Sequence, residues 1–185
     1  TMMVNNSCIA IGSNMQECAS CHIGYGWVDA QFDFTNPANI DCLVCHDTTG
    51  TYRKEPGRGG MPDPSIDLAE IARQVGRPSR RACGSCHFAS GGAPYTKHGD
   101  LEPALADPPA DLDTHMGVLK MRCQNCHQTT AHRIAGMSMS APAVEGRVGC
   151  ERCHGQTPHG VSGVLSRHLD DHIRAVACET CHIPM

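Results

Sequence analysis

The chain has 185 residues, of which 40% are hydrophobic, and a formal net charge of −4, which excludes a disordered acidic tail and argues against a nucleic-acid-binding surface. No stretch approaches the roughly 20 consecutive apolar residues that a membrane-spanning helix needs. The composition is unusual in having 13 Cys and 12 His but only one Trp, three Tyr and three Phe. Because so few large apolar side chains are present, we expect bound groups to supply most of the hydrophobic core.

Regular secondary structure is expected to be sparse. Residues 55–64 contain three Pro and three Gly and are predicted to form a loop. Ser65 then caps a predicted helix that ends at Gly76 and Pro78. The apolar face of this helix consists of Leu68, Ile71, Ala72 and Val75.

The second half of the chain contains one more predicted helix. Residues 89–113 are rich in Pro, Gly and Asp and are expected to be mostly irregular. Within residues 162–177, Leu165, Leu169 and Ile173 recur every four residues, which predicts an amphipathic helix. His168 and His172 lie on the neighbouring stripe, and we expect them to face bound groups, although a zinc pair or two solvated histidines would give the same pattern.

Six C-x-x-C-H motifs recur along the chain. Their cysteine pairs are Cys18/Cys21, Cys42/Cys45, Cys83/Cys86, Cys123/Cys126, Cys150/Cys153 and Cys178/Cys181, and the histidines that follow are His22, His46, His87, His127, His154 and His182. C-x-x-C-H is the attachment signature of c-type haem, in which two thiols bind the vinyl groups and the histidine is the proximal iron ligand. The sequence therefore predicts six covalent haems, with several motifs on short helical turns.

Other uses of paired cysteines fit the pattern less well. Zinc ribbons, dithiol redox sites and disulfide frameworks all use C-x-x-C, but none requires a histidine directly after the second cysteine. The intervals between motifs are too short for each segment to enclose its own haem, and too irregular for a solenoid. We therefore expect one continuous domain over residues 1–185, mainly irregular with short α-helices and almost no β-structure, organised around packed haems.

Six histidines remain outside the motifs, as many as there are predicted haems. They are His98, His115, His132, His159, His168 and His172. This equality favours bis-histidine ligation at most irons, with these six as candidate distal ligands. Methionine is the other common sixth ligand, but the nine Met residues are expected to fill gaps against porphyrin faces instead.

Two further features have open interpretations. Tyr25, Trp27, Phe32 and Phe34 either flank the first haem or form a local hydrophobic cluster. Cys8 is the thirteenth cysteine, and we expect a free buried thiol rather than an intermolecular disulfide or a sulfur-binding group.

The text between the motifs resembles one family of multihaem cytochromes. The matching phrases are CASCHIGYGWVDAQFDFTNPANIDCLVCHDTTGTYRK, KHGDLEPAL, DTHM, CQNCHQTTAHRIAG, CERCHGQTPH and ACETCHIP. These phrases are similar to the octahaem tetrathionate reductase family and cover nearly the whole chain. The resemblance implies an electron-carrying cytochrome in the periplasm or outside the cell, with the six spare histidines as candidate distal ligands.

The chain also departs from that family. The family carries eight haems, and its catalytic haem sits in a C-x-x-C-K motif that this sequence does not contain. The chain matches the last six haem sites, so it is either a short hexahaem relative or part of a longer protein.

We accordingly expect electron transfer through six haems, with no catalytic residue and no tetrathionate reduction by this chain alone. The alternatives are a haem-dependent reductase of a sulfur or nitrogen oxyanion, and the repeating unit of an extracellular cytochrome filament. The expected partners are redox proteins and, through exposed terminal haems, copies of the chain itself; nucleic acid and membrane are not expected.

Overall fold

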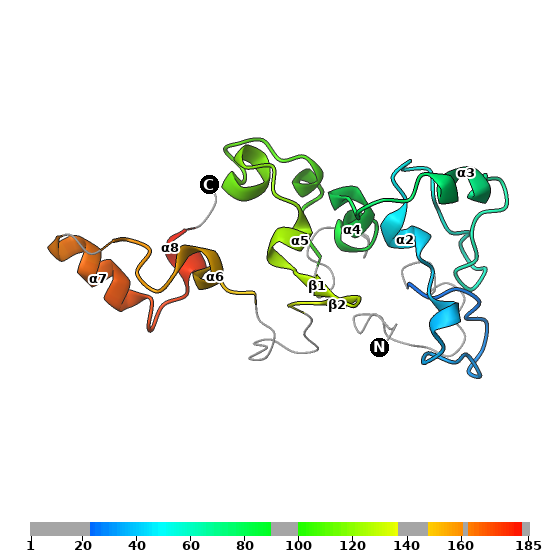
Figure 1. The fold of residues 1–185 in the computed structure, drawn as a ribbon, viewed down its shortest axis with the longest axis horizontal. Helices are drawn as coiled ribbons and strands as arrows, with labels where there is room; N and C mark the ends of the chain where they lie inside the picture. The colour runs from blue at the N-terminus through cyan, green and yellow to red at the C-terminus, as the bar shows by residue number, and fades with distance from the viewer. Residues whose placement is uncertain (1–22, 90–99, 137–147, 161–162, 183–185) are drawn as a thin grey trace. The chain divides into compact units, whose positions relative to one another are not determined.

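The computed structural model describes residues 23–89, 100–136, 148–160 and 163–182 (Figure 1). The chain divides into two compact units, an N-terminal unit of Thr1–Pro108 and a C-terminal unit of Pro109–Met185. The sequence-based expectation of one hexahaem domain over residues 1–185 is not tested by this division and stays a prediction.

Short helices separated by irregular segments make up the N-terminal unit. They are the 3₁₀ turns η2 (Pro37–Asn39) and η3 (Pro103–Ala106) and the α-helices α2 (Leu43–His46), α3 (Leu68–Arg73) and α4 (Arg80–His87). Helices α2 and α4 are in contact, as are α4 and η3. Residues 55–64 form a loop, as predicted.

The C-terminal unit has the same character. Its elements are the π-helical turn η4 (Thr114–Val118), α5 (Cys123–Cys126), β1 (Thr129–Thr130), β2 (Arg133–Ile134), α6 (Glu151–His154), α7 (Val164–His172) and α8 (Cys178–Cys181). Strands β1 and β2 pair antiparallel, with Thr129 opposite Ile134 and Thr130 opposite Arg133. The predicted fold class, mainly irregular with short helices and almost no β-structure, is confirmed.

Helix α3 forms within the segment that the apolar periodicity predicts, but it ends at Arg73, before Val75, and its N-cap differs from the prediction. Asp67, not Ser65, is the N-cap, and its carboxylate accepts a hydrogen bond from the Glu70 N–H at 2.9 Å. Ser65 instead belongs to the preceding turn, where its N–H and hydroxyl both donate to the Asp63 carboxylate. With Asp67 rather than Ser65 as its N-cap, the helix starts two residues later than expected.

The buried hydrophobic side chains of the described residues are few. Ile71 is 2% exposed and Trp27 is 7% exposed, and both belong to the N-terminal unit. Trp27 packs against Phe34 with ring centroids 5.1 Å apart, and Phe32 lies 4.9 Å from Phe34. Trp27, Phe32 and Phe34 therefore form a local cluster. The alternative, that the aromatic residues flank the first haem, concerns a motif outside the described residues and stays a prediction.

Among the residues that the structure describes, no helix combines the length and the apolar character required to cross a membrane.

Candidate haem attachment sites

Four of the described motifs form a single helical turn with the same backbone hydrogen bond. The histidine N–H donates to the carbonyl of the first cysteine, at 2.9 Å in Cys42–His46, 2.8 Å in Cys123–His127, 3.0 Å in Cys150–His154 and 2.9 Å in Cys178–His182. The motif Cys83–His87 lies inside α4, which Ser79 caps by accepting from the Ala82 N–H. The expectation that short helices carry these motifs is met; the first motif, Cys18, Cys21 and His22, lies outside the described residues.

His46 is oriented by the segment that follows α3. Its Nδ1 lies 2.8 Å from the Gly76 carbonyl oxygen, and the Gly76 N–H donates to the His46 carbonyl at 2.9 Å. A ring that donates from Nδ1 to a backbone carbonyl keeps Nε2 available as a metal ligand. The segment that follows α3 therefore fixes the orientation of this imidazole.

His127 is oriented in the same way by the β1–β2 hairpin. Its Nδ1 lies 2.9 Å from the Ala135 carbonyl oxygen, because the hairpin returns the chain to the end of the motif. Gly136 follows with φ of 86°, and a Cβ at this position would lie 2.8 Å from His127 Nδ1. The glycine is thus required by the close approach of the backbone to the ring.

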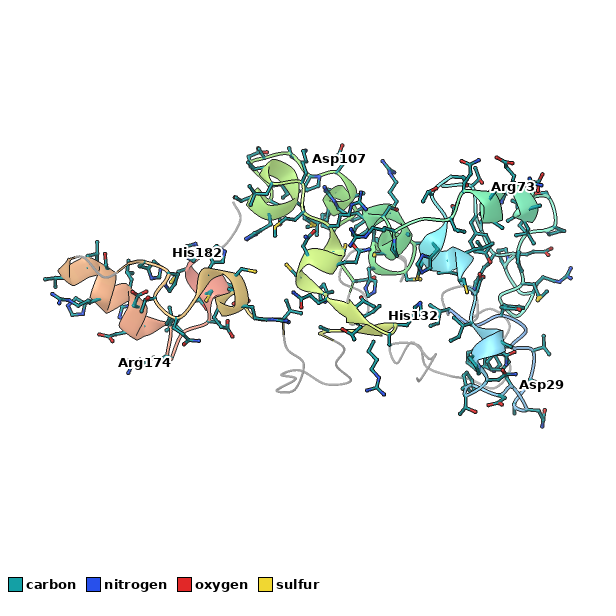
Figure 2. All side chains as sticks on the ribbon, in the orientation of Figure 1. Asp29, Arg73, Asp107, His132, Arg174 and His182 are labelled. Atoms are coloured by element: carbon teal, nitrogen blue, oxygen red, sulfur yellow. The ribbon has the colours of Figure 1, made fainter. Side chains whose placement is uncertain are left out.

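The tip of the same hairpin carries His132 (Figure 2). Ala131 and His132 are the two turn residues, with φ of 48° and 62°. Two-residue hairpin turns with both φ values positive normally use Asn or Gly, and each non-glycine residue in this region costs about 1–2 kcal/mol. The turn therefore holds His132 in a backbone conformation that local preferences alone would not select.

Neighbouring motifs are close to one another within each unit. In the N-terminal unit, burial and the nearby Cys86 thiol, followed by Asp41, raise the pKa of the Cys45 thiol. In the C-terminal unit, Cys150 is an exposed residue, yet partial desolvation of its thiol, then the Glu179 carboxylate and Cys178, raise its pKa. Groups attached to such adjacent thiols would lie close together, as electron transfer requires.

A polar cluster lies directly before α2. Asp41 is 8% exposed, accepts hydrogen bonds from the Leu43 N–H at 3.1 Å and from the Tyr52 hydroxyl, and lies 4.0 Å from Lys54 Nζ. Lys54 also donates to the Gly24 carbonyl at 2.8 Å. Burial, the hydrogen bond to Asp41 and its negative charge raise the pKa of Tyr52 above its usual range. This cluster fixes the chain where it enters the motif.

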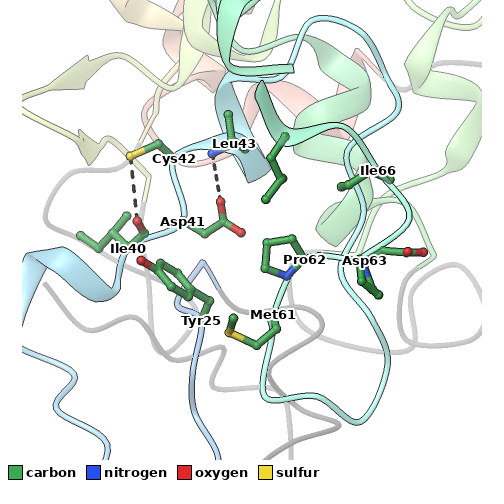
Figure 3. A pocket seen from close by; sticks show the side chains of 11 residues that line it. Tyr25, Ile40, Asp41, Cys42, Leu43, Met61, Pro62, Asp63 and Ile66 are labelled. Atoms are coloured by element: carbon green, nitrogen blue, oxygen red, sulfur yellow. Dashed lines mark hydrogen bonds between the residues drawn. The ribbon is translucent and has the colours of Figure 1, made fainter. Parts of the chain in front are cut away.

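A cavity of about 480 Å³ adjoins the Cys42 thiol (Figure 3). Its walls are mostly apolar and are formed by Tyr25, Ile40, Asp41, Cys42, Leu43, Met61, Pro62, Asp63, Pro64, Ile66 and Leu68. A second cavity of about 780 Å³, in the C-terminal unit, is bordered by Cys150, His154 and Cys178. Both hollows therefore open beside cysteine thiols of the motifs.

Two motif histidines each face a histidine from outside the motifs. The ring centroids of His115 and His154 are 6.0 Å apart, with the planes at 77°, and those of His159 and His182 are 6.1 Å apart, with the planes at 11°. His115 belongs to η4, in which the N-cap Asp113 accepts from the Met116 N–H. His159 is held by Asp170 of α7, whose Oδ1 lies 2.9 Å from His159 Nδ1 (His182 is labelled in Figure 2).

Two further candidate distal ligands are not brought together with described motif histidines in the same way. His168 and His172 lie on α7, as predicted, but both are exposed and neither stacks with another described histidine. His98 and Cys8 lie outside the described residues. Sequence reasoning missed the acceptors Gly76, Ala135 and Asp170; two of these act through backbone carbonyls, which leave no signal in the side-chain pattern.

The residues fit a covalently bound haem. The structure describes ten motif cysteines and joins none of them in a disulfide, which agrees with thioether attachment. His46 and His127 hold Nδ1 in hydrogen bonds that leave Nε2 for iron. Across the same described residues, no three His, Cys, Asp or Glu side chains converge as they would around a metal ion that the protein alone encloses.

Comparisons with known proteins agree with these features. The family model for cytochrome c554 and c-prime matches residues 82–155. An uncharacterized protein of Archaeoglobus fulgidus is 28% identical over 149 residues, 70% of this chain and 50% of that protein.

A solved structure gives a stronger match. The crystal structure of octaheme cytochrome c from Shewanella oneidensis is 48% identical, with a TM-score of 0.79 over 98% of this chain and 40% of that one. This chain therefore spans half or less of the length of the relatives it matches. The resemblance to octahaem cytochromes that the sequence indicated is confirmed, and the chain is a multihaem c-type cytochrome.

Proposed function

We propose that this chain transfers electrons through six covalently attached c-type haems, one at each C-x-x-C-H motif, and that most of the irons have two histidine ligands. Haem iron supplies reversible one-electron chemistry. The polypeptide contributes the attachment points, the axial ligands and the spacing between them. An octahaem cytochrome at 48% identity and the six intact motifs support the haem number.

The observation that carries this proposal is the two pairs of neighbouring histidines in the C-terminal unit. A bond from imidazole nitrogen to a first-row metal is about 2.0–2.1 Å, so an iron between two rings places their centroids about 6 Å apart. His115/His154 and His159/His182 have separations of 6.0 and 6.1 Å. Each pair joins one motif histidine to one spare histidine, as bis-histidine ligation requires. We infer that His115 is the distal ligand at the Cys150–Cys153 motif and His159 at the Cys178–Cys181 motif.

Intact mass and electron paramagnetic resonance (EPR) test the proposal together. The mature protein should carry six haem adducts that survive acid–acetone extraction, and its oxidised spectrum should be low-spin. His115→Ala and His159→Ala should each convert one haem to a high-spin signal. His115→Met is the matched control, since a thioether can replace the imidazole and should retain a low-spin iron of raised potential. Fewer than six adducts, or two alanine variants with unchanged spectra, would contradict the proposal.

The proposed partners are redox proteins and further copies of the chain. Of the described motif cysteines, Cys42, Cys126, Cys150, Cys153 and Cys181 are exposed, which supports haem edges that a partner can approach. We propose a location outside the cytoplasmic membrane, because c-type haem is attached there. Electron micrographs of the native material would distinguish a filament from a soluble carrier.

Catalysis by this chain alone is not part of the proposal. Reduction of an oxyanion requires an iron with an open position, and the paired histidines favour closed irons. A substantial high-spin signal in the unmodified protein, together with reoxidation by tetrathionate, would instead support the reductase alternative.

A further inference from the structure

We propose that Asp170 is a positioning residue: it holds His159 against the iron at the Cys178–Cys181 motif and lowers the reduction potential of that haem. The inference rests on the proposed function, because it requires His159 and His182 to be axial ligands of one iron.

Asp170 fixes His159 at two points with one oxygen atom. Its Oδ1 accepts from the His159 backbone N–H at 3.2 Å and lies 2.9 Å from the ring Nδ1. The backbone bond fixes the position of the residue, and the ring bond fixes the rotation of the imidazole. Nε2 is then the nitrogen left to bind iron, on a ring that lies within 11° of the His182 plane.

The acceptor at His159 differs in charge from the acceptors at two motif histidines. His46 and His127 contact the neutral carbonyls of Gly76 and Ala135, at 2.8 and 2.9 Å. A hydrogen bond from imidazole to a carboxylate is stronger than one to a carbonyl, and it increases the negative charge on the ring. The ferric iron carries one more positive charge than the ferrous iron, so such a ring stabilises the ferric state.

The environment of Asp170 preserves this effect. Its side chain is 11% exposed, so solvent screens its charge only weakly. In the described part of the chain, no Arg or Lys forms an ion pair with it. The adjacent cavity is bordered by four other charged residues, Arg167, Asp171, Arg174 and Glu179. Their charges are present both with and without the Asp170 carboxylate, so they do not account for a difference between the two proteins.

Asp171 provides a matched control. It is the next residue of α7, borders the same cavity and carries the same charge, but it is exposed and its carboxylate has no histidine partner in the described residues. Asp170→Asn removes the charge yet keeps an oxygen that can accept from His159, whereas Asp171→Asn removes a charge without altering any histidine contact.

The experiment is a redox titration of the full-length haem-loaded protein, followed by EPR. Near-parallel ring planes, such as those of His159 and His182, give a rhombic low-spin signal. Near-perpendicular planes, such as those of His115 and His154, give a strongly anisotropic signal. The two classes of haem can therefore be followed separately. In Asp170→Asn, one haem of the near-parallel class should favour the ferrous form roughly tenfold more, which is about 59 mV upward for one electron. Asp171→Asn should shift the same signal much less.

The outcomes separate this inference from the proposed function. If Asp170→Asn leaves the potential unchanged, or shifts it no more than Asp171→Asn does, the inference is wrong even though the haem is bis-histidine ligated. If His159→Ala leaves every haem low-spin, His159 is not a ligand and the proposed function fails first. Asp170→Ala should add a partial high-spin signal, because the ring loses its orienting partner, and a fully low-spin spectrum in that variant would contradict the positioning role.

Discussion

The two units differ in what occupies their interiors. In the N-terminal unit, Trp27 and Ile71 are buried, and so are the carboxylates of Asp41, Asp47 and Asp100. In the described residues of the C-terminal unit, by contrast, Gly117 is the only buried residue. Leu165 and Leu169 of α7, the apolar stripe that the sequence predicts, are 72% and 37% exposed. The same motif thus occurs in a unit with a small protein core and in a unit whose described residues contain no such core.

This difference indicates how the haems contribute to folding. Burial of apolar surface contributes about 25 cal/mol per Å², and the described residues of the C-terminal unit include almost no side chain that supplies it. Haems attached at the motifs would supply the remaining apolar surface. We therefore expect the C-terminal unit to depend on haem attachment for its fold, and the N-terminal unit to keep part of its structure without it.

The largest effect should follow from removing one haem from each unit in turn. Cys150→Ala combined with Cys153→Ala should unfold much of the C-terminal unit, because this attachment motif borders the second cavity and its His154 faces His115. Cys42→Ala combined with Cys45→Ala should leave the region around Trp27 and Ile71 protected. Hydrogen exchange measured by mass spectrometry reports both outcomes, and equal loss of protection in the two variants would refute the distinction.

A smaller but still large effect is expected when a single proximal ligand is removed. His127→Ala removes the proposed iron ligand and leaves the Ala135 carbonyl without its ring donor. The variant should mature poorly and become sensitive to limited proteolysis in the hairpin. Thr130→Ala, at an exposed hairpin position, is the control and should behave as the unmodified protein does. Normal maturation and unchanged thermal stability in His127→Ala would contradict the view that haem forms the core.

A third prediction concerns the protein core of the N-terminal unit. Ile71→Ala should lower the free energy of unfolding by about 2–5 kcal/mol, because it leaves a cavity at a side chain that is 2% exposed. Leu165→Ala, at a side chain that is 72% exposed in the other unit, should change it by less than about 0.5 kcal/mol. Chemical denaturation followed by circular dichroism measures both. A larger effect at Leu165 than at Ile71 would reveal that haem covers α7 in the mature protein.

The sequence predicts the chemistry of this protein better than its geometry. The six motifs and their inter-motif phrases identify a multihaem cytochrome, because covalent haem attachment demands a fixed spacing of Cys and His. The helices α3 and α7 follow from apolar periodicity, although the cap of α3 is Asp67 rather than Ser65. Two potential caps only two residues apart compete, and the preceding Asp63 turn engages Ser65.

What the sequence does not predict is the long-range pairing. His115 and His154 are 39 positions apart, and His159 and His182 are 23 apart. No local pattern distinguishes these histidines from His168 and His172, which share a helix and a favourable spacing yet stack with no other described histidine. The backbone acceptors Gly76 and Ala135 are equally invisible, since any residue type supplies a carbonyl.

The smallest effect is expected at Tyr52, whose ionisation should make the stability of the N-terminal unit, but not that of the C-terminal unit, depend on alkaline pH. Tyr52 donates to the buried Asp41 carboxylate, so Tyr52→Phe should lower the free energy of unfolding by about 1–3 kcal/mol at neutral pH. Burial and the neighbouring Asp41 raise the pKa of Tyr52 in the folded state above the value of about 10 for an unfolded chain. This stabilisation is therefore complete below about pH 10 and decreases as the pH rises further, because only the unfolded chain ionises there.

Denaturation at neutral pH and at about pH 11 should show a larger alkaline loss of stability in the unmodified protein than in Tyr52→Phe. Tyr25→Phe, a more exposed position on the nearby cavity, is the control. Hydrogen exchange at the higher pH should show the loss of protection in amides of the N-terminal unit and not in those of the C-terminal unit. An equal loss of protection in both would show that the two units unfold as one.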